Sequence, residues 1–179
     1  MIQDNLFKKI NVNMPTDFDS FKLKGEKQIS YGGSLSYYHI KDREYFSNIF
    51  PSLCKIPPAT IFYVEIIGNI KPHRDHNVSC CINYYFTSNN STTYFYKHIE
   101  NTAPWVFPGK KTANIYASAS VECVDKFKSD DNETYLLNVS EIHSVNTKSS
   151  GVRRFITWQW TPSQASYQDI LDNLNYSVF

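Results

Sequence analysis

Four side chains, two in the middle of the chain and two nearer its end, have types and spacings that suggest metal chemistry. His73 and Asp75 are separated by one residue, and His143 and Arg153 follow far downstream. Residues i and i+2 of an extended segment point to the same side, so His73 and Asp75 can bind one ion from one strand, with His76 facing away. Two imidazoles, one carboxylate and a fixed cation form the ligand set of a 2-His-1-carboxylate iron(II) site with a place for an acidic co-substrate.

The segment that leads to the first two ligands is rich in β-branched and aromatic residues. Residues 60–73 predict a strand, then a bend at Gly68 and Asn69, then a metal-binding turn that carries His73.

The other two side chains lie on two further strand-like runs, residues 135–145 and 153–160, which a polar loop joins. If these runs pair as a hairpin, His143 and Arg153 occupy neighbouring positions across the loop. The metal and the cation would then be a few ångströms apart.

The motif Ile70-Lys-Pro-His-Arg-Asp75, with a distal His143 and with Arg153 ten residues later, resembles the iron(II)- and 2-oxoglutarate-dependent oxygenases. The likeness is greatest to the short hydroxylases related to prolyl and aspartyl/asparaginyl hydroxylases, and it covers residues 60 to 160. It implies a cytoplasmic enzyme that binds iron(II) through the two histidines and Asp75. It also implies 2-oxoglutarate and dioxygen as co-substrates and the hydroxylation of a protein side chain or a small amino-acid-like molecule.

Several side chains are candidates to bind 2-oxoglutarate. A planar guanidinium suits the far carboxylate, and strand alternation favours Arg153 over Arg154, although a bulge near Gly151 would exchange them. Tyr63 and Asn83 lie on the strands that flank the metal turn and are candidates to hydrogen-bond the co-substrate, although such polar groups are often only structural.

The remaining pattern predicts a mainly β protein. Aromatic residues make up 16% of the 179 residues, with 13 Tyr and 12 Phe, which suits broad sheet faces. Residues 79–86 and 92–96 look like a hairpin, and residues 113–117 and 120–127 add two strands. About eight strands with short turns suit a jelly roll, and the resemblance implies the same double-stranded β-helix. We expect one domain spanning residues 1–179.

Two helices are predicted to flank the sheets. The first covers residues 42–50, with Asp42 as N-cap and Pro51 at its end, and the second follows Pro162, with Ser166 and Asp169 in capping-box spacing.

Charge and cysteine content narrow the function classes. The formal net charge is +1, from 18 basic and 17 acidic residues, so no overall field draws the chain to nucleic acid, although a local basic groove stays open. No apolar run is long enough to span a membrane. The four cysteines lack a C-x-x-C pair and are expected to be reduced thiols, as in a cytoplasmic protein. The oligomeric state and the substrate are not fixed by the sequence.

Two alternatives to the hydroxylase remain. The first is an oxygenase that acts on a modified nucleobase, in which Trp105 and the Lys110-Lys111 pair would contact nucleic acid. The second is a non-catalytic, cupin-like binding jelly roll in which the histidines are satisfied structural side chains. The loop at residues 101–111 is either a substrate lid or a long loop pinned by its aromatic residues.

Overall fold

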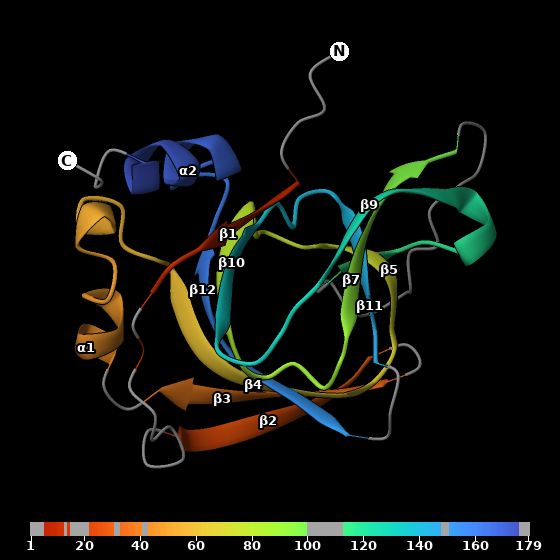
Figure 1. Ribbon diagram of the computed structural model, residues 1–179, viewed down its shortest axis with the longest axis horizontal. Coiled ribbons are helices and arrows are strands. Elements are labelled where there is room, and N and C mark those ends of the chain that lie inside the picture. The colour runs from red at the N-terminus through yellow and green to blue at the C-terminus, as the bar shows by residue number, and fades with distance from the viewer. Residues whose placement is uncertain are drawn as a thin grey trace.

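The structure, a computed structural model, describes residues 6–12, 14, 22–30, 33–40, 43–99, 113–147 and 151–175. These residues form two antiparallel sheets (Figure 1). The larger sheet has the order β1 (Phe7–Ile10), β10 (Glu133–Leu137), β6 (Cys80–Thr87), β12 (Val152–Trp160), β4 (Thr60–Gly68), β3 (Gly33–Ile40) and β2 (Lys22–Ser30). The smaller sheet has the order β8 (Ala113–Ile115), β5 (Ile70–Asp75), β11 (Ile142–Asn146), β7 (Thr92–His98) and β9 (Val121–Lys128). The helical elements are α1 (Arg43–Ser47), η2 (Pro51–Leu53), η3 (Ser118–Ser120) and α2 (Tyr167–Asn175).

Eight of the strands follow the path of a long hairpin wound into a helix. β4 pairs with β12, β5 with β11, β6 with β10 and β7 with β9, so each strand of the first half meets its counterpart in the second. Further pairings of β12 with β6 and of β11 with β7 close the two sheets. This is the jelly roll, or double-stranded β-helix, that the sequence predicted.

The bend between β4 and β5 is where the chain leaves the larger sheet for the smaller one. Gly68 has a φ of 81°, a conformation that residues with a side chain rarely adopt. The neighbouring strand comes very close here, because a Cβ atom on Gly33 would lie 2.7 Å from the carbonyl oxygen of Ile67. The predicted bend is therefore confirmed, but it leads into a strand, β5, and not directly into a turn.

The predicted hairpin of residues 135–145 with residues 153–160 is wrong. The first run is split into β10 and β11, which belong to different sheets, and β11 does not pair with β12. The backbone N–H of Asp75 donates to the carbonyl of Val139 at 3.3 Å, and that of Ser140 donates to Ser79 at 3.2 Å. These bonds hold the segment that crosses between the sheets. His143 and Arg153 therefore face each other from opposite sheets.

The predicted hairpin of residues 79–86 with residues 92–96 is wrong for the same reason. Both runs are strands, but β6 lies in the larger sheet and β7 in the smaller one. The link between them crosses the edge of the sandwich, as jelly-roll connections do.

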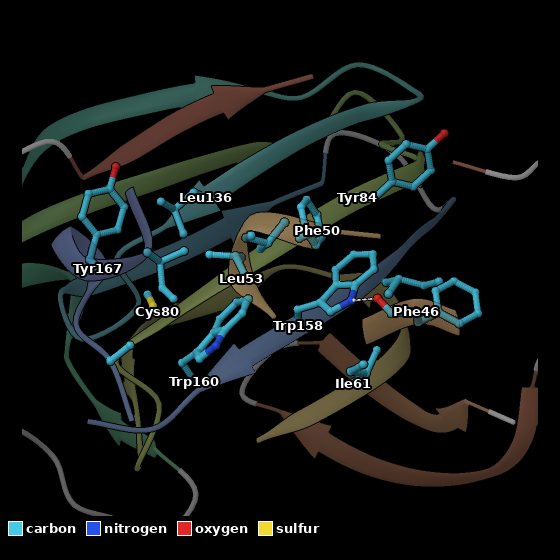
Figure 2. Packing of buried hydrophobic residues seen from close by; sticks show 14 of the residues in the cluster. Phe46, Phe50, Leu53, Ile61, Cys80, Tyr84, Leu136, Trp158, Trp160 and Tyr167 are labelled. Atoms are coloured by element: carbon cyan, nitrogen blue, oxygen red, sulfur yellow. Dashed lines mark hydrogen bonds between the residues drawn. The ribbon is translucent and has the colours of Figure 1, made fainter. Parts of the chain in front are cut away.

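The outer face of the larger sheet carries a hydrophobic core covered by the helices (Figures 1 and 2). Trp158 is fully buried there, and its indole N–H donates to the carbonyl of Phe46 at 2.7 Å. The predicted first helix is shorter than expected, since α1 ends at Ser47 and η2 follows; Asp42 lies outside the described residues. The predicted capping box of α2 is confirmed, because Ser166 and Asp169 exchange hydrogen bonds of 2.8 and 3.2 Å.

All four cysteines are free thiols, as expected. In the described part of the chain, no helix has the length and apolar character needed to cross a membrane.

Candidate metal centre

Three potential metal ligands converge on the inner face of the smaller sheet. His73 and Asp75 lie two residues apart on β5, and His143 on β11 is the direct cross-strand partner of His73. The centroids of the two imidazole rings are 4.3 Å apart, and the ligating atoms of all three residues lie within 4.8 Å of one another. Strand register alone thus joins residues that are far apart in the sequence.

Hydrogen bonds to the backbone fix the orientation of both imidazoles. The Nδ1 atom of His73 lies 2.8 Å from the carbonyl oxygen of Lys71, and that of His143 lies 3.0 Å from the carbonyl oxygen of Glu141. Because a carbonyl only accepts, each Nδ1 carries the hydrogen and each Nε2 keeps a free lone pair. This tautomer is the one that second-shell carbonyls commonly impose on metal-bound histidines.

The electrostatics of the triad suit a cation. Burial, together with the neighbouring His73, lowers the pKa of His143 from 6.5 to about 4, so this imidazole is neutral and ready to bind a metal. Burial also opposes a charge on His73, but the adjacent Asp75 carboxylate outweighs it and raises the pKa of His73. The Nε2 atom of His73 lies 3.5 Å from Oδ1 of Asp75. The Asp75 carboxylate therefore favours a positive charge beside Nε2 of His73, whether that charge belongs to a proton or to a metal ion.

A buried cation lies on the opposite wall. Arg153 on β12 is 2% exposed, and its guanidinium carbon sits 4.3 Å from the ring centroid of Tyr85. One terminal nitrogen donates to the hydroxyl of Thr93 at 3.2 Å, whereas the Nε atom has no hydrogen-bond partner. Arg154 points outward and pairs with Glu65 at 3.3 Å. Strand alternation therefore places Arg153, not Arg154, inside the roll.

The triad and Arg153 line one cavity between the two sheets, with a volume of about 80 Å³. This volume is several times what one water molecule needs, so a small ligand has room. Apolar side chains such as Val64, Ile66 and Leu137 form much of the remaining wall.

Of the two other residues predicted to bind the co-substrate, one lines the cavity and the other does not. Asn83 on β6 lines the cavity and is 7% exposed, and its Oδ1 atom has no hydrogen-bond partner. Tyr63 is not brought to the cavity: it lies on the outer face of the larger sheet, stacked on Phe86 at 5.9 Å, and its hydroxyl donates to Glu65.

Sequence reasoning missed two residues that contact Arg153. Tyr85 follows Asn83 by two positions on the same strand, so alternation could have indicated it. Thr93 lies in the other sheet and carries no comparable signal. The loop at residues 101–111, predicted to be either a substrate lid or a long pinned loop, lies outside the described residues. His76 is exposed, as expected.

The residues present fit a divalent metal ion with an anionic co-ligand. Two imidazole nitrogens and one carboxylate form a donor set that suits iron(II), although other divalent ions bind such sites. The unpaired guanidinium supplies the counter-charge that a small carboxylate needs.

No family model matches the chain, and no curated protein matches it. Similar solved structures include a 2OG-Fe(II) oxygenase-family oxidoreductase from Burkholderia pseudomallei, at 7% identity over 84% of this chain and 79% of that chain, with a TM-score of 0.46. The cupin domain of Drosophila melanogaster CENP-C matches at 7% identity, over 82% of this chain and 85% of that chain, with a TM-score of 0.37. A mutant of Bacillus subtilis oxalate decarboxylase matches at 12% identity over 76% of this chain, with a TM-score of 0.38, and this chain spans only 28% of its length. At these low values the jelly-roll assignment rests on the strand order and register of the chain itself.

Proposed function

We propose that this chain is an iron(II)- and 2-oxoglutarate-dependent oxygenase that hydroxylates a protein side chain or a small amino-acid-like molecule. One observation carries the proposal. A His-Asp-His triad and a buried guanidinium face each other across the same small cavity, and the guanidinium has no carboxylate partner among the described residues.

The ligand count supports an oxygenase more than a purely structural metal site. Three protein ligands leave three octahedral positions open, enough for the 2-oxo and C1-carboxylate oxygens of 2-oxoglutarate and for dioxygen. Bound iron(II) supplies the redox chemistry, in which 2-oxoglutarate and dioxygen give succinate and carbon dioxide while one oxygen atom enters a C–H bond of the substrate.

The protein residues position the reactants and exclude water. The carbonyls of Lys71 and Glu141 hold the two imidazoles with Nε2 toward the ion. Arg153 anchors the far carboxylate of the co-substrate from the opposite sheet. The apolar walls lower the polarity around the cavity, so each charge interaction inside it is stronger than in water.

An anaerobic titration tests the co-substrate site. Metal-free protein receives iron(II) and then 2-oxoglutarate, and the weak visible charge-transfer band of the chelate is followed. We expect the band in wild type and in Arg154→Ala, whereas Arg153→Ala needs at least about tenfold more 2-oxoglutarate, because a charged hydrogen bond contributes about 1.5–3 kcal/mol. Equal behaviour of the two variants would remove Arg153 from the site.

Succinate formation tests the metal triad. His143→Ala removes one ligand and is expected to abolish succinate formation, whereas His76→Ala, at an exposed position on the same segment as His73, is expected to keep it. Turnover by His143→Ala at the wild-type rate would reject the proposed centre.

The anaerobic titration and an assay of nucleic-acid binding distinguish the proposed function from the two alternatives. A protein that holds no iron and ignores 2-oxoglutarate would be a binding jelly roll. Steeply salt-dependent binding of single-stranded DNA or RNA would favour a modified nucleobase as the substrate.

A further inference from the structure

A second hollow lies on the outer face of the smaller sheet, on the other side of that sheet from the metal triad. Thr93 and His143 line the inner cavity, so strand alternation turns the residues that follow them, Tyr94 and Ser144, to the outer face. The hollow has a volume of about 260 Å³. The helices α1 and α2 lie against the larger sheet, on the far side of the molecule (Figure 1).

The hollow is a groove with an aromatic wall and a wall that carries a cation. Tyr94 and Tyr96 of β7 form the first wall, with ring centroids 6.4 Å apart and an angle of 27° between the rings. The segment 69–72, which includes Lys71, forms the second wall, and Ser144 of β11 lies between the two. The hydroxyls of Tyr96 and Ser144 are hydrogen-bonded at 2.8 Å, which fixes the ring of Tyr96 beside this small residue. We call this hollow the outer groove.

The outer groove carries positive charge. Lys71 is the one charged side chain among the described residues that line it. The ammonium of Lys126, the cross-strand partner of Tyr94, lies 6.0 Å from the centre of the Tyr94 ring. Neither lysine forms an ion pair with a described residue. An anionic partner is therefore favoured, because it supplies the missing counter-charge.

The strands under the outer groove have no free edge. β11 is paired with β5 on one side and with β7 on the other, and β7 is also paired with β9. A peptide therefore cannot bind here by adding a strand to the sheet. A polyproline II segment meets this constraint, because its backbone needs no strand partner and its proline rings pack on aromatic side chains.

We propose that the outer groove binds an acidic polyproline II segment of a partner protein, with prolines on Tyr94 and Tyr96 and a carboxylate beside Lys71. Proline has no N–H group, so such a segment offers mainly carbonyl and carboxylate acceptors. The ammonium of Lys71 and the side-chain amide of Asn146, which also lines the groove, supply donors for them. The proposal does not depend on the metal triad or on the proposed function.

A single-stranded nucleic acid fits the outer groove less well. Bases also stack on tyrosines, but every nucleotide adds a phosphate, and binding then needs a row of cations. The described lining provides Lys71, with Lys126 at its margin, and the same strand as Lys126 also carries Glu122 and Asp125.

Fluorescence anisotropy tests the proposal with the full chain and no added metal. The probe is a labelled peptide of three glutamate–proline–proline repeats. Peptides of the same length with lysine in place of glutamate, or with glycine in place of proline, serve as comparisons. We expect saturable binding of the first peptide alone, because the groove selects both the charge and the conformation of its ligand.

Variants locate the binding site. Tyr94→Ala is expected to weaken the Kd by about fivefold or more, through loss of an aromatic contact, and Lys71→Gln by about two- to fivefold, with a smaller effect of salt. Tyr45→Ala and Lys55→Gln are the matched controls, because both residues are exposed on the helical side of the larger sheet, and they should bind as wild type does.

A heteronuclear NMR titration of the wild-type protein gives a second measurement that does not require the Tyr94 variant to fold. Amide shifts should centre on β7, β11 and residues 69–72. Equal binding of the lysine peptide, no binding of the glutamate peptide, or shifts centred elsewhere would each overturn the proposal. Tighter binding of labelled oligouridine that Tyr94→Ala abolishes would also overturn it and assign the groove to nucleic acid.

Discussion

The guanidinium of Arg153 is a buried charge that the fold only partly satisfies. One hydrogen bond to Thr93 and the face of the Tyr85 ring are its main described contacts, and its Nε atom has no hydrogen-bond partner. Taking a cation out of water costs several kcal/mol unless a counter-charge compensates. The ligand-free protein therefore carries a destabilised residue whose missing partner is the anion that we propose it binds.

Replacing this arginine is expected to stabilise the ligand-free protein while weakening its response to the co-substrate. Arg153→Met should raise the free energy of unfolding by about 1 kcal/mol or more, because an apolar side chain of similar length needs no counter-charge. Wild type should gain about 2.7 kcal/mol from 2-oxoglutarate at 100 times its Kd, and at the same concentration the variant, with an at least tenfold weaker Kd, should gain about 1.4 kcal/mol or less. Urea unfolding with and without the ligand measures both effects.

Arg154→Met provides the control, since Arg154 is half-exposed and pairs with Glu65 outside the cavity. Its response to 2-oxoglutarate should match that of wild type. A destabilised Arg153→Met would show instead that the guanidinium is a structural residue of the core.

Tyr63 shows that a sequence does not always reveal which face of a sheet a strand residue occupies. The segment Thr60-Ile-Phe-Tyr-Val-Glu-Ile-Ile-Gly68 is apolar on both faces, because helices cover one side and the second sheet covers the other. Alternation of apolar and polar residues, which would reveal the inner face, is therefore absent. The candidate ligands His73, Asp75 and His143 could be selected from the sequence because their side-chain chemistry, and not hydrophobic patterning, distinguishes them.

Tyr63→Phe is accordingly expected to leave the affinity for 2-oxoglutarate unchanged. The lost hydroxyl bonds Glu65 on the outer face, away from the cavity. Calorimetric titration of the anaerobic, iron(II)-loaded protein with 2-oxoglutarate provides the measurement, with Arg153→Ala for comparison. A tenfold loss in Tyr63→Phe would show that the two faces of this sheet are coupled.

At the scale of elements, the bend at Gly68 determines the position of His73 and Asp75, the candidate ligands on β5. Its positive φ lets the chain pass from one sheet to the other within two residues, before the strand that carries His73 begins. Gly68→Ala should lower the free energy of unfolding by about 1–2 kcal/mol, the cost of a side chain in the left-handed region.

Gly68→Asn is the matched comparison, because asparagine tolerates this conformation better than alanine does. Urea unfolding should rank the proteins as wild type, then Gly68→Asn, then Gly68→Ala. Equal losses in the two variants would point to crowding of the side chain and not to backbone conformation.

The strands themselves were predictable, but their partners were not. Residues 135–145 contain neither Gly nor Pro, the usual strand breakers, so the sequence does not mark the change of sheet near Asn138. The change is set by distant contacts, such as the N–H of Asn138 donating to the carbonyl of Leu6 at 2.9 Å. Pairing in a jelly roll is mostly non-local, so hairpin rules based on short loops assign the wrong neighbours.

On the scale of the whole molecule, the two faces of the larger sheet have different roles. The outer face packs the hydrophobic core, and the inner face lines the candidate site. The outer face packs Trp158 and Trp160 beneath the helices (Figure 2). The inner face carries Arg153 and Asn83. The composition and the number of strands predicted the jelly roll. Which side chains face the core and which face the cavity became clear only from the pairing register of the strands.

Trp158→Phe tests that separation. The variant loses the hydrogen bond to the carbonyl of Phe46 and leaves a gap in a tightly packed core. We expect the free energy of unfolding to fall by about 2 kcal/mol or more. The Kd for 2-oxoglutarate, measured well below the unfolding temperature, should stay at the wild-type value. A weaker affinity of this variant for 2-oxoglutarate would show that a change in the outer core alters the cavity on the inner face.

The wound-hairpin topology also sets an order of assembly. Loop closure costs more as the intervening chain lengthens, so the pairing of β7 with β9 is the least costly and that of β4 with β12 the most costly. We expect the strand pairs to form in order of increasing loop length, beginning with β7 and β9. The pairing of β5 with β11 then brings His73 next to His143 before the pairing of β12 places Arg153 in the cavity. Pulse-labelling hydrogen exchange during refolding should then protect the amides of β7 and β9 before those of β4 and β12. A nascent chain would thus acquire its metal site before its co-substrate site.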